Sequence, residues 1–252
     1  IILASYAIGC RTAYIYLRGE FVAGAVIMEQ AIQGAAARGY LGYNVLGSGF
    51  SLEVHLHRGA GAYICGEETA LLESLEGKRG LPRLKPPFPA SSGLYRLPTV
   101  VNNVETLCNL PHIVLRGAEW FSSIGSPKST GNRIFSVSGH VRRPGNYELP
   151  MDVPMRELIF QHAGGMRGDR RLKAVIPGGS SVPVLTEQHL DTRMDFESLA
   201  KAGSMAGSGG VIVMDDSTCM VRAGEIVARF YHHESCGQCT QCREGTAWLH
   251  KT

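Results

Sequence analysis

Three evenly spaced cysteines, in Cys236-Gly237-Gln238-Cys239-Thr240-Gln241-Cys242, constrain this chain more than any other feature. Thiolates at this spacing can converge on one metal centre from a tight turn, and the sequence lacks the second, separated Cys pair of a four-ligand zinc ribbon. Three close cysteines plus one distant ligand are typical of a cubane iron–sulfur cluster. The pattern therefore favours a four-iron cluster on Cys236, Cys239 and Cys242 over zinc or structural thiols. No cysteine follows Cys242, so the fourth ligand is expected outside residues 1–252.

The other bulk properties exclude several classes of protein. Seven cysteines, an odd and clustered set, make a poor disulfide framework and indicate a reducing compartment. A net charge of +3 is too small to indicate nucleic acid or anionic lipid by charge alone. No run of 18 apolar residues occurs, which excludes a membrane-spanning helix. Because the chain opens without Met and ends inside a helical pattern, we expect an internal piece of a longer polypeptide.

Apolar periodicity in the first half of the chain predicts an α/β layered arrangement. The expected elements are a strand at 13–17, a helix over 26–35 stopped by Gly39, a strand at 51–57, and helices at 67–75 and 104–115. Between them, residues 80–99 hold five prolines and are expected to form a long, functional loop.

The second half predicts a small α+β domain followed by helix. Alternation at 134–138 and 147–149 around a turn at 143–146 indicates a hairpin. A helix over 155–162, strands at 173–176 and 211–214, and an unbroken helical pattern from Thr218 onward complete the expected elements.

The glycine-rich turn at residues 59–69 is the second chemical signal. Glycines between a strand and a helix let the backbone approach a cofactor, and the helix N-terminus offers amide hydrogens. Glu67 and Glu68 also have a simpler interpretation, because acidic residues in a first turn complement the helix dipole. Further along, Asn102 with Glu105 resembles a capping box, with ligand contact by the amide side chains as the alternative.

Four further residue sets have both a functional and an ordinary interpretation. Phe88 is either a core residue or an aromatic ring that stacks on a flat ligand. Lys85 and Arg83 either bind phosphates or keep their loop soluble. His55 and His57 share one face of a strand, where packed or solvent-facing side chains are favoured over metal ligands. Arg243 either raises the potential of a neighbouring cluster or is a solvated helix residue.

Four motifs in one order carry a resemblance to a known family: residues 62–71, 82–89, 102–106 and 234–239. Together they closely resemble the NADH-oxidising flavoprotein subunit of respiratory complex I, a bacterial NADH–quinone oxidoreductase. The stretches 138–141 and 176–181 match as well, so the resemblance spans essentially all 252 residues. The diaphorase subunits of NAD-linked hydrogenases and of NAD-dependent formate dehydrogenases are relatives with the same motifs.

The resemblance implies three regions. Residues 1–120 would be the C-terminal part of an FMN/NADH-binding α/β domain, residues 121–214 an α+β β-grasp (SLBB-type) domain, and residues 215–252 the start of a helical 4Fe-4S bundle. The family's glycine-rich and acidic FMN/NADH motifs would lie upstream of Ile1.

The resemblance also implies roles for individual residues. Phe88 would stack on the adenine of NADH, and Cys236, Cys239 and Cys242 would bind the 4Fe-4S cluster. Glu68 is assigned to catalysis as a positioning and charge-tuning carboxylate. The residues that would line or hold FMN are Tyr63, Gly66, Glu67, Glu68, Val101, Asn102, Asn103 and Thr106.

The implied function is hydride transfer from NADH to FMN, followed by single-electron transfer to the cluster, within a proton-translocating NADH:quinone oxidoreductase. The implied partners are the other peripheral-arm subunits, especially the 2Fe-2S subunit and the large iron–sulfur subunit, with no nucleic acid and no membrane insertion. The implied location is the cytoplasmic face of the bacterial inner membrane. The alternatives are a hydrogenase or formate dehydrogenase diaphorase, and a non-enzymatic iron–sulfur or nucleotide-binding scaffold.

Overall fold

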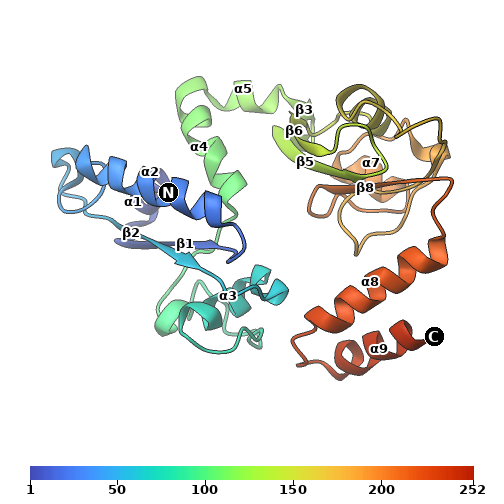
Figure 1. Ribbon diagram of the computed structural model, residues 1–252. Helices are drawn as coiled ribbons and strands as arrows, with labels where there is room; N and C mark the ends of the chain where they lie inside the picture. Colours follow the sequence, from blue (N-terminus) through green and yellow to red (C-terminus); the bar gives the residue numbers. More distant parts are fainter. The chain divides into compact units, whose positions relative to one another are not determined.

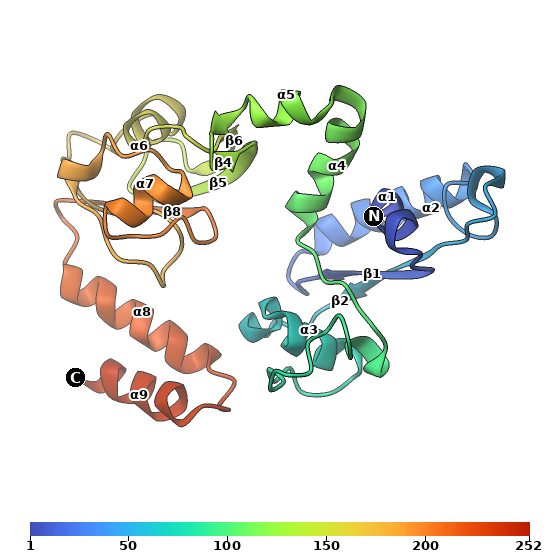
Figure 2. The same cartoon turned by 180° about the vertical axis from the view of Figure 1, so that it is seen from behind.

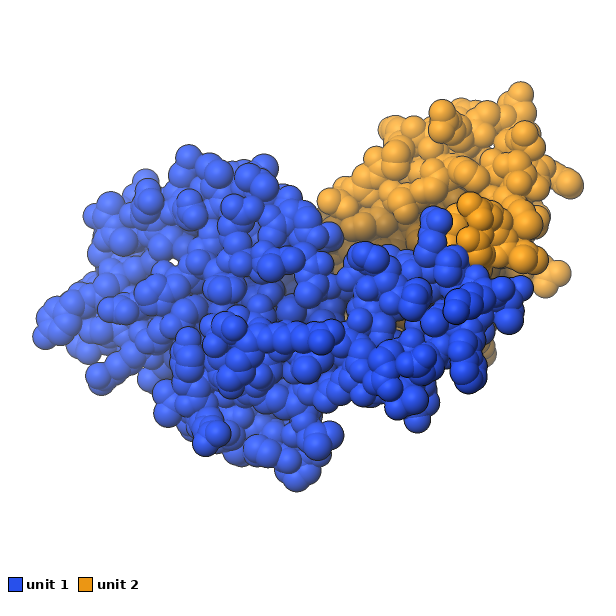
Figure 3. Space-filling view, turned by 60° about the horizontal axis from the view of Figure 1, so that its bottom comes forward, with its two compact units in different colours: residues 1–110, 228–252 blue, residues 111–227 orange.

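A computed structural model describes all residues 1–252, which form two compact units. Unit 1 contains residues 1–110 and 228–252, and unit 2 contains residues 111–227 (Figure 3). The chain passes between the units within two helices, α4 (Val104–Arg116) and α8 (Met220–Glu234). Unit 1 therefore joins the first part of the chain to its last 25 residues, which carry the cysteine motif.

Unit 1 is built around two parallel strands, β1 and β2. Helices α1 and α2 lie on one side of the strand pair and α3 on the other (Figures 1 and 2). The predicted strands and helices are confirmed here, with α2 ending just before Gly39, whose φ of 73° suits a helix stop. The elements are α1 (Ile2–Ile8), β1 (Thr12–Leu17), α2 (Val22–Ala37), β2 (Glu53–Arg58), α3 (Glu68–Leu75) and α9 (Thr240–Lys251).

Unit 2 contains a mixed four-stranded sheet in the order β6-β5-β8-β7. Strands β5, β6 and β8 are labelled in Figure 1. The central strands β5 and β8 are parallel and both outer pairs are antiparallel, an arrangement that fits the predicted β-grasp domain. The elements are α5 (Ala118–Ser122), β3 (Gly125–Ser126), β4 (Ser129–Thr130), β5 (Asn132–Gly139), β6 (Gly145–Pro150), α6 (Met155–Glu157), a π turn (Leu158–His162), β7 (Leu172–Ile176), α7 (Phe196–Lys201) and β8 (Gly210–Asp215).

A buried apolar cluster holds unit 2 together. Phe135 and Val137 of β5 pack with Val213 of β8 and with Leu158 and Leu199 of the helical segments. The alternation that predicted β5 arises because every second side chain enters this core.

Two sequence expectations need correction. The helical pattern predicted from Thr218 onward is not continuous, because α8 ends at Glu234 and α9 begins only at Thr240. The hairpin is confirmed, but its connection is longer than the predicted turn, since the last cross-strand pair is Val137 with Gly145. β5 continues beyond that pair because Ser138 and Gly139 pair with β8 instead.

Candidate functional site

The start of α3 is fixed by Glu67. Its Oε2 atom accepts hydrogen bonds from the backbone N–H of Thr69 at 2.9 Å and of Ala70 at 2.8 Å, and from the Thr69 hydroxyl. Burial alone would raise the pKa of Glu67, but these hydrogen bonds and nearby Lys85 hold the pKa below its ordinary value. Glu67 is therefore the N-cap of α3, which confirms the helix-start interpretation. Its predicted contact with a flavin remains a prediction.

Glu68 is paired with a lysine from the proline-rich loop. The Lys85 ammonium donates to Glu68 Oε1 and lies 3.4 Å from Glu67 Oε1. The hydrogen bond to Glu68 is the largest cause that raises the pKa of Lys85. Lys85 thus ties the loop to the first turn of α3, and the side chain of Glu68 is still 41% exposed beside it.

The glycine-rich turn leaves its backbone accessible. Gly61 has a φ of +83°, a conformation that favours glycine. At Gly66, no heavy atom lies within 4 Å of where a Cβ would stand, so the backbone borders open space. Tyr63, three residues earlier, is 58% exposed. The turn therefore leaves room for the close approach of a planar cofactor, and the cofactor contact itself remains a prediction.

Arg83 holds the base of the proline-rich loop. Its guanidinium bonds to Glu73, to Glu76 and to the carbonyl of Gly93, and its backbone N–H donates to the Thr69 hydroxyl at 2.8 Å. Neither interpretation of Arg83 from the sequence is right, because this side chain is committed to internal contacts and is only 24% exposed.

The loop presents Phe88 to solvent. The residue is 59% exposed, so it is not a core residue of this chain. The adjacent Pro89 is buried, and its carbonyl accepts from the backbone N–H of Thr99 at 2.9 Å. The loop is thus anchored at Pro89 while Phe88 stays free to contact a flat ligand, although the stacking partner itself remains a prediction.

The segment that opens α4 corrects the predicted cap. Asn103, and not Asn102, caps the helix, because its Oδ1 accepts from the backbone N–H of Glu105 at 2.8 Å. Asn102, Asn103 and Thr106 are exposed, and Val101 is half-buried. Their predicted contacts with FMN remain a prediction.

The cysteine motif forms a loop between α8 and α9. Gly237 has a φ of +79°, Cys239 is the N-cap of α9, and Cys242 lies in its first turn. All three thiols are free, with Cys236 half-buried and the other two exposed. The side chains are not gathered into a set of three metal ligands. The tight turn and three thiol donors nevertheless fit a cubane cluster that takes its fourth ligand from elsewhere.

Contacts within unit 1 join this cysteine loop to the glycine turn and the proline-rich loop. Glu234 accepts from the backbone N–H of Tyr63 at 3.3 Å, and the rings of Tyr63 and Phe230 lie 5.2 Å apart, edge to face. The Gln238 side-chain amide donates to the Pro82 carbonyl at 3.0 Å. Sequence reasoning missed Phe230, and no local pattern marked it.

Two arginines also hold the cysteine loop by its main chain. Arg79 donates to the carbonyl of Cys236 at 3.0 Å, and Arg243 donates to the carbonyl of Gly237 at 2.7 Å. Arg243 is therefore not simply a solvated helix residue. Arg79 was not singled out from the sequence, because it lies in no motif and 157 positions from its partner.

The paired histidines of β2 pack as expected. The parallel register sets Tyr14 opposite His55 and Tyr16 opposite His57, and the ring centroids lie 5.2 Å and 5.3 Å apart. Cross-strand aromatic packing therefore accounts for both histidines.

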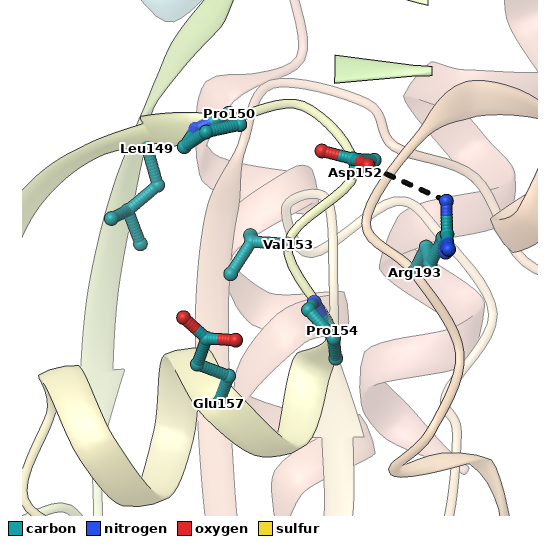
Figure 4. Close-up of a pocket in the computed structure, with 7 residues that line it drawn as sticks. All are labelled: Leu149, Pro150, Asp152, Val153, Pro154, Glu157 and Arg193. Carbon is teal, nitrogen blue, oxygen red and sulfur yellow. Dashed lines mark hydrogen bonds and ion pairs between the residues drawn. The ribbon is translucent and has the colours of Figure 1, made fainter. Parts of the chain in front are cut away.

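A small cavity in unit 2 contains none of the predicted site residues. It has a volume of about 250 Å³, and an ion pair between Asp152 and Arg193, 3.4 Å apart, borders it (Figure 4). It is lined by Leu149, Pro150, Asp152, Val153, Pro154, Glu157 and Arg193.

Comparison with protein families gives three matches in the predicted order. Residues 1–112 match the Nuo51 FMN-binding domain, residues 133–213 the SLBB domain, and residues 223–252 the NADH-ubiquinone oxidoreductase-F iron-sulfur binding region. These matches confirm the predicted fold class and the predicted cofactors, FMN and a 4Fe-4S cluster.

Curated relatives resemble the chain over nearly its whole length. It is 61% identical to an F subunit of NADH-quinone oxidoreductase, numbered 2, of Rhizobium meliloti (strain 1021), covering 99% of this chain and 59% of that protein. It is 58% identical to the F subunit of NADH-quinone oxidoreductase of Rickettsia bellii (strain OSU 85-389), covering 98% of this chain and 60% of the relative. The chain thus spans about 60% of the length of the curated relatives it matches.

A solved structure also resembles this chain. An NAD+-reducing [NiFe]-hydrogenase in the H2-reduced state superposes with a TM-score of 0.87 at 40% identity, covering 100% of this chain and 41% of that chain. The air-oxidised form of such an enzyme gives a TM-score of 0.85 at 39% identity, covering 99% of this chain and 41% of that chain.

Proposed function

The chain belongs to the family of NADH-oxidising flavoprotein (F) subunits of NADH–quinone oxidoreductase, and we propose that the full-length protein oxidises NADH with FMN and passes the electrons singly to a 4Fe-4S cluster. The electrons would continue toward quinone through other subunits of the complex. The observation that carries the proposal is that, within unit 1, the glycine-rich turn at residues 59–69 is in contact with the segment that carries the cysteine loop. Tyr63, in that turn, contacts both Glu234 and Phe230, which lie just ahead of Cys236.

Each part of unit 1 has a task in this proposal. The open backbone at Gly66 and the exposed face of Tyr63 would receive FMN, together with Val101, Asn102, Asn103 and Thr106 of the α4 start. Phe88 would stack on the adenine of NADH, because it is an exposed ring on an anchored loop. Glu67 keeps α3 capped, so that the turn ahead of the helix holds its shape.

Glu68 is proposed to act by charge and position. FMN, when bound, supplies the conversion from two-electron to one-electron chemistry. Glu68 stands at the N-terminus of α3 with Lys85 as its counter-ion, so it would fix the local charge and accept a hydrogen bond from NADH. No general base is needed for hydride transfer, so the carboxylate of Glu68 has no proton to accept in this step.

Cys236, Cys239 and Cys242 are proposed as three ligands of the 4Fe-4S cluster, with the fourth cysteine beyond residue 252. Gly237, with its positive φ, permits the tight turn between Cys236 and Cys239, and Cys242 lies in the first turn of α9. Thiolate ligands of this number and spacing suit a cubane better than a single zinc ion.

The proposed partners are the neighbouring peripheral-arm subunits, particularly the 2Fe-2S subunit and the large iron–sulfur subunit. The proposed location is the cytoplasmic face of the bacterial inner membrane, as a peripheral subunit. Among the helices of the structure, none has the length and apolar character needed to cross a bilayer.

A diaphorase subunit is the second candidate, and the likeness to the NAD+-reducing hydrogenase at 40% identity favours it over a non-enzymatic scaffold. The higher identity of 61% to an NADH-quinone oxidoreductase places complex I first. Both candidates use the same cofactors at unit 1, and they differ in the redox partner beyond the cluster: quinone as electron acceptor in the first, and hydrogen or formate as electron donor in the second.

The test is made on the full-length protein in its assembled complex. Expected results are bound FMN, iron with acid-labile sulfide, loss of flavin absorbance on addition of NADH, and NADH-dependent reduction of quinone. Stoichiometric zinc without iron, or absence of FMN, would contradict the proposal. Reduction of NAD+ with hydrogen or formate as the electron donor, in place of NADH-dependent reduction of quinone, would assign the protein to the diaphorases.

A further inference from the structure

The cysteine loop is held by a pair of guanidinium groups that come from distant parts of the sequence. Arg79 follows α3 and donates to the Cys236 carbonyl at 3.0 Å, whereas Arg243 lies on α9 and donates to the Gly237 carbonyl at 2.7 Å. A Cβ built on Gly237 would stand 3.8 Å from Arg243 Cδ and 4.0 Å from Arg79 Nη2. Both side chains therefore reach the same turn of the loop.

A second contact runs beside the first. Gln238 donates to the carbonyl of Pro82 at 3.0 Å, so residues 79 and 82 bond to residues 236 and 238 respectively. Arg83, the next residue, is fixed by Glu73 and Glu76 of the α3 region. Residues 79–82, which hold the cysteine loop, are thus anchored at their C-terminal end by Arg83. They include the start of the proline-rich loop.

The two arginines at the loop would favour the reduced state of a cluster bound there. Reduction adds one negative charge, and a nearby cation stabilises that charge by Coulomb attraction. Arg243 forms an ion pair with Glu244 at 3.0 Å, which offsets part of its charge. Arg79 donates to a main-chain carbonyl and not to a carboxylate, so its positive charge is offset less than that of Arg243.

We propose that Arg79 is a positioning residue for the iron–sulfur cluster. Arg79 holds the cysteine loop against the segment that follows α3 and, together with Arg243, raises the reduction potential of the cluster. The inference rests on the proposed function, since it requires that the cluster is present. It adds a residue outside the cysteine motif to the electron-transfer route, and it joins that route to the loop that carries Phe88.

The test compares single variants of the full-length protein in its complex. Arg79→Gln removes the charge, Arg79→Lys keeps it, and Arg38→Gln makes the same change in net charge at the end of α2. The cluster is followed by redox titration with electron paramagnetic resonance, alongside FMN and iron content. For Arg79→Gln we expect the equilibrium constant for cluster reduction to fall about tenfold, or about 59 mV for a one-electron couple.

The controls separate charge from structure. Arg79→Lys should stay closer to the wild-type potential than Arg79→Gln, and Arg38→Gln should leave both the potential and NADH-dependent flavin reduction unchanged. If Arg79→Gln does not assemble its cluster, Arg243→Gln provides the same measurement from the other side of the turn, again with a lowered potential expected.

Two outcomes overturn the inference in distinguishable ways. A wild-type protein without iron and sulfide overturns the proposed function and this inference with it. A wild-type protein with a cluster, whose potential is unchanged in both Arg79→Gln and Arg243→Gln, overturns the inference alone.

Discussion

The two units of the molecule are stabilised by different physical means. Unit 2 has a contiguous cluster of 18 buried residues between Phe135 and Val213. Unit 1 buries only seven hydrophobic residues, and its functional segments are held by caps, ion pairs and single hydrogen bonds. Apolar burial is insensitive to pH and charge, whereas polar contacts depend on both. The difference places the candidate site in the part of the chain that responds to charge, which suits a segment that handles charged cofactors.

The largest expected effect comes from removing part of the unit 2 core. Leu158 is fully buried, so Leu158→Ala should reduce the free energy of unfolding of unit 2 by about 2–5 kcal/mol. Leu249→Ala is the matched change in unit 1, where the side chain is 67% exposed, and it should cost no more than about 0.5 kcal/mol. Hydrogen exchange at the β5 and β8 amides of the full-length protein measures the first effect. Equal costs for the two variants would contradict the contrast between the units.

Arg83 tests the polar side of the comparison. Arg83→Gln removes hydrogen bonds to the carboxylates of Glu73 and Glu76 while keeping a polar side chain. Hydrogen bonds to charged groups contribute about 1.5–3 kcal/mol, so α3 and the proline-rich loop should lose about that much stability. Thermal denaturation with proteolysis of the loop reports the change. Arg96→Gln, an exposed arginine in the same region, serves as control, and an equal effect there would argue against a specific role for Arg83.

Acid should weaken unit 1 through Glu76. Hydrogen bonds from Lys78, Arg83 and the Tyr95 backbone lower its pKa to about 2, from an ordinary value of 4.5. Because the folded pKa is depressed, this stabilisation is complete above about pH 4.5 and is lost as the pH falls toward about 2. After allowance for solvent screening of Lys78, about 1–2 kcal/mol is expected. Urea midpoints across this pH range check it, and Glu76→Gln should flatten the curve. An unchanged slope in that variant would sink the assignment.

Phe88 is expected to affect substrate binding and not stability, because its ring is exposed. Phe88→Ala should raise KM for NADH about two- to tenfold, which corresponds to stacking worth about 0.5–1.5 kcal/mol. FMN content and melting temperature should match the wild type. Leu84→Ala, another exposed apolar residue of the loop, is the control. A lower melting temperature with an unchanged KM would show that the ring packs within the protein.

Glu68 should give the smallest effect. Lys85 already offsets its charge, and exposed pairs contribute about 0.2–1 kcal/mol. Glu68→Gln should therefore raise the two-electron flavin potential by at most about 20 mV, on a scale where 30 mV is about 1.4 kcal/mol. Lys85→Met should shift the potential the other way. If only the melting temperature falls, Glu68 acts on the α3 helix dipole alone.

The sequence by itself determined what depends on local spacing. Alternation predicted β5, apolar periodicity predicted α2, and Gly39 predicted where α2 ends, because each pattern reflects the dihedral angles and burial of neighbouring residues. The cysteine spacing likewise predicted the kind of metal centre without any structure. Local spacing could not predict which residue caps α4. Asn102 and Asn103 both suit an N-cap position, and only the path of the chain selects Asn103.

The tertiary structure alone decided which distant polar groups meet. The contact of Arg79 with Cys236 spans 157 positions, and that of Tyr63 with Glu234 spans 171. Neither leaves a periodic signal, because a single exposed arginine or a single backbone N–H looks the same in sequence whether or not a partner is near. The parallel pairing of β5 with β8 is of the same kind, since parallel strands need a long crossover connection to bring them side by side. Sequence patterns report how a residue contacts its neighbours along the chain. The contact between the glycine-rich turn and the cysteine segment depends instead on the path of the whole backbone.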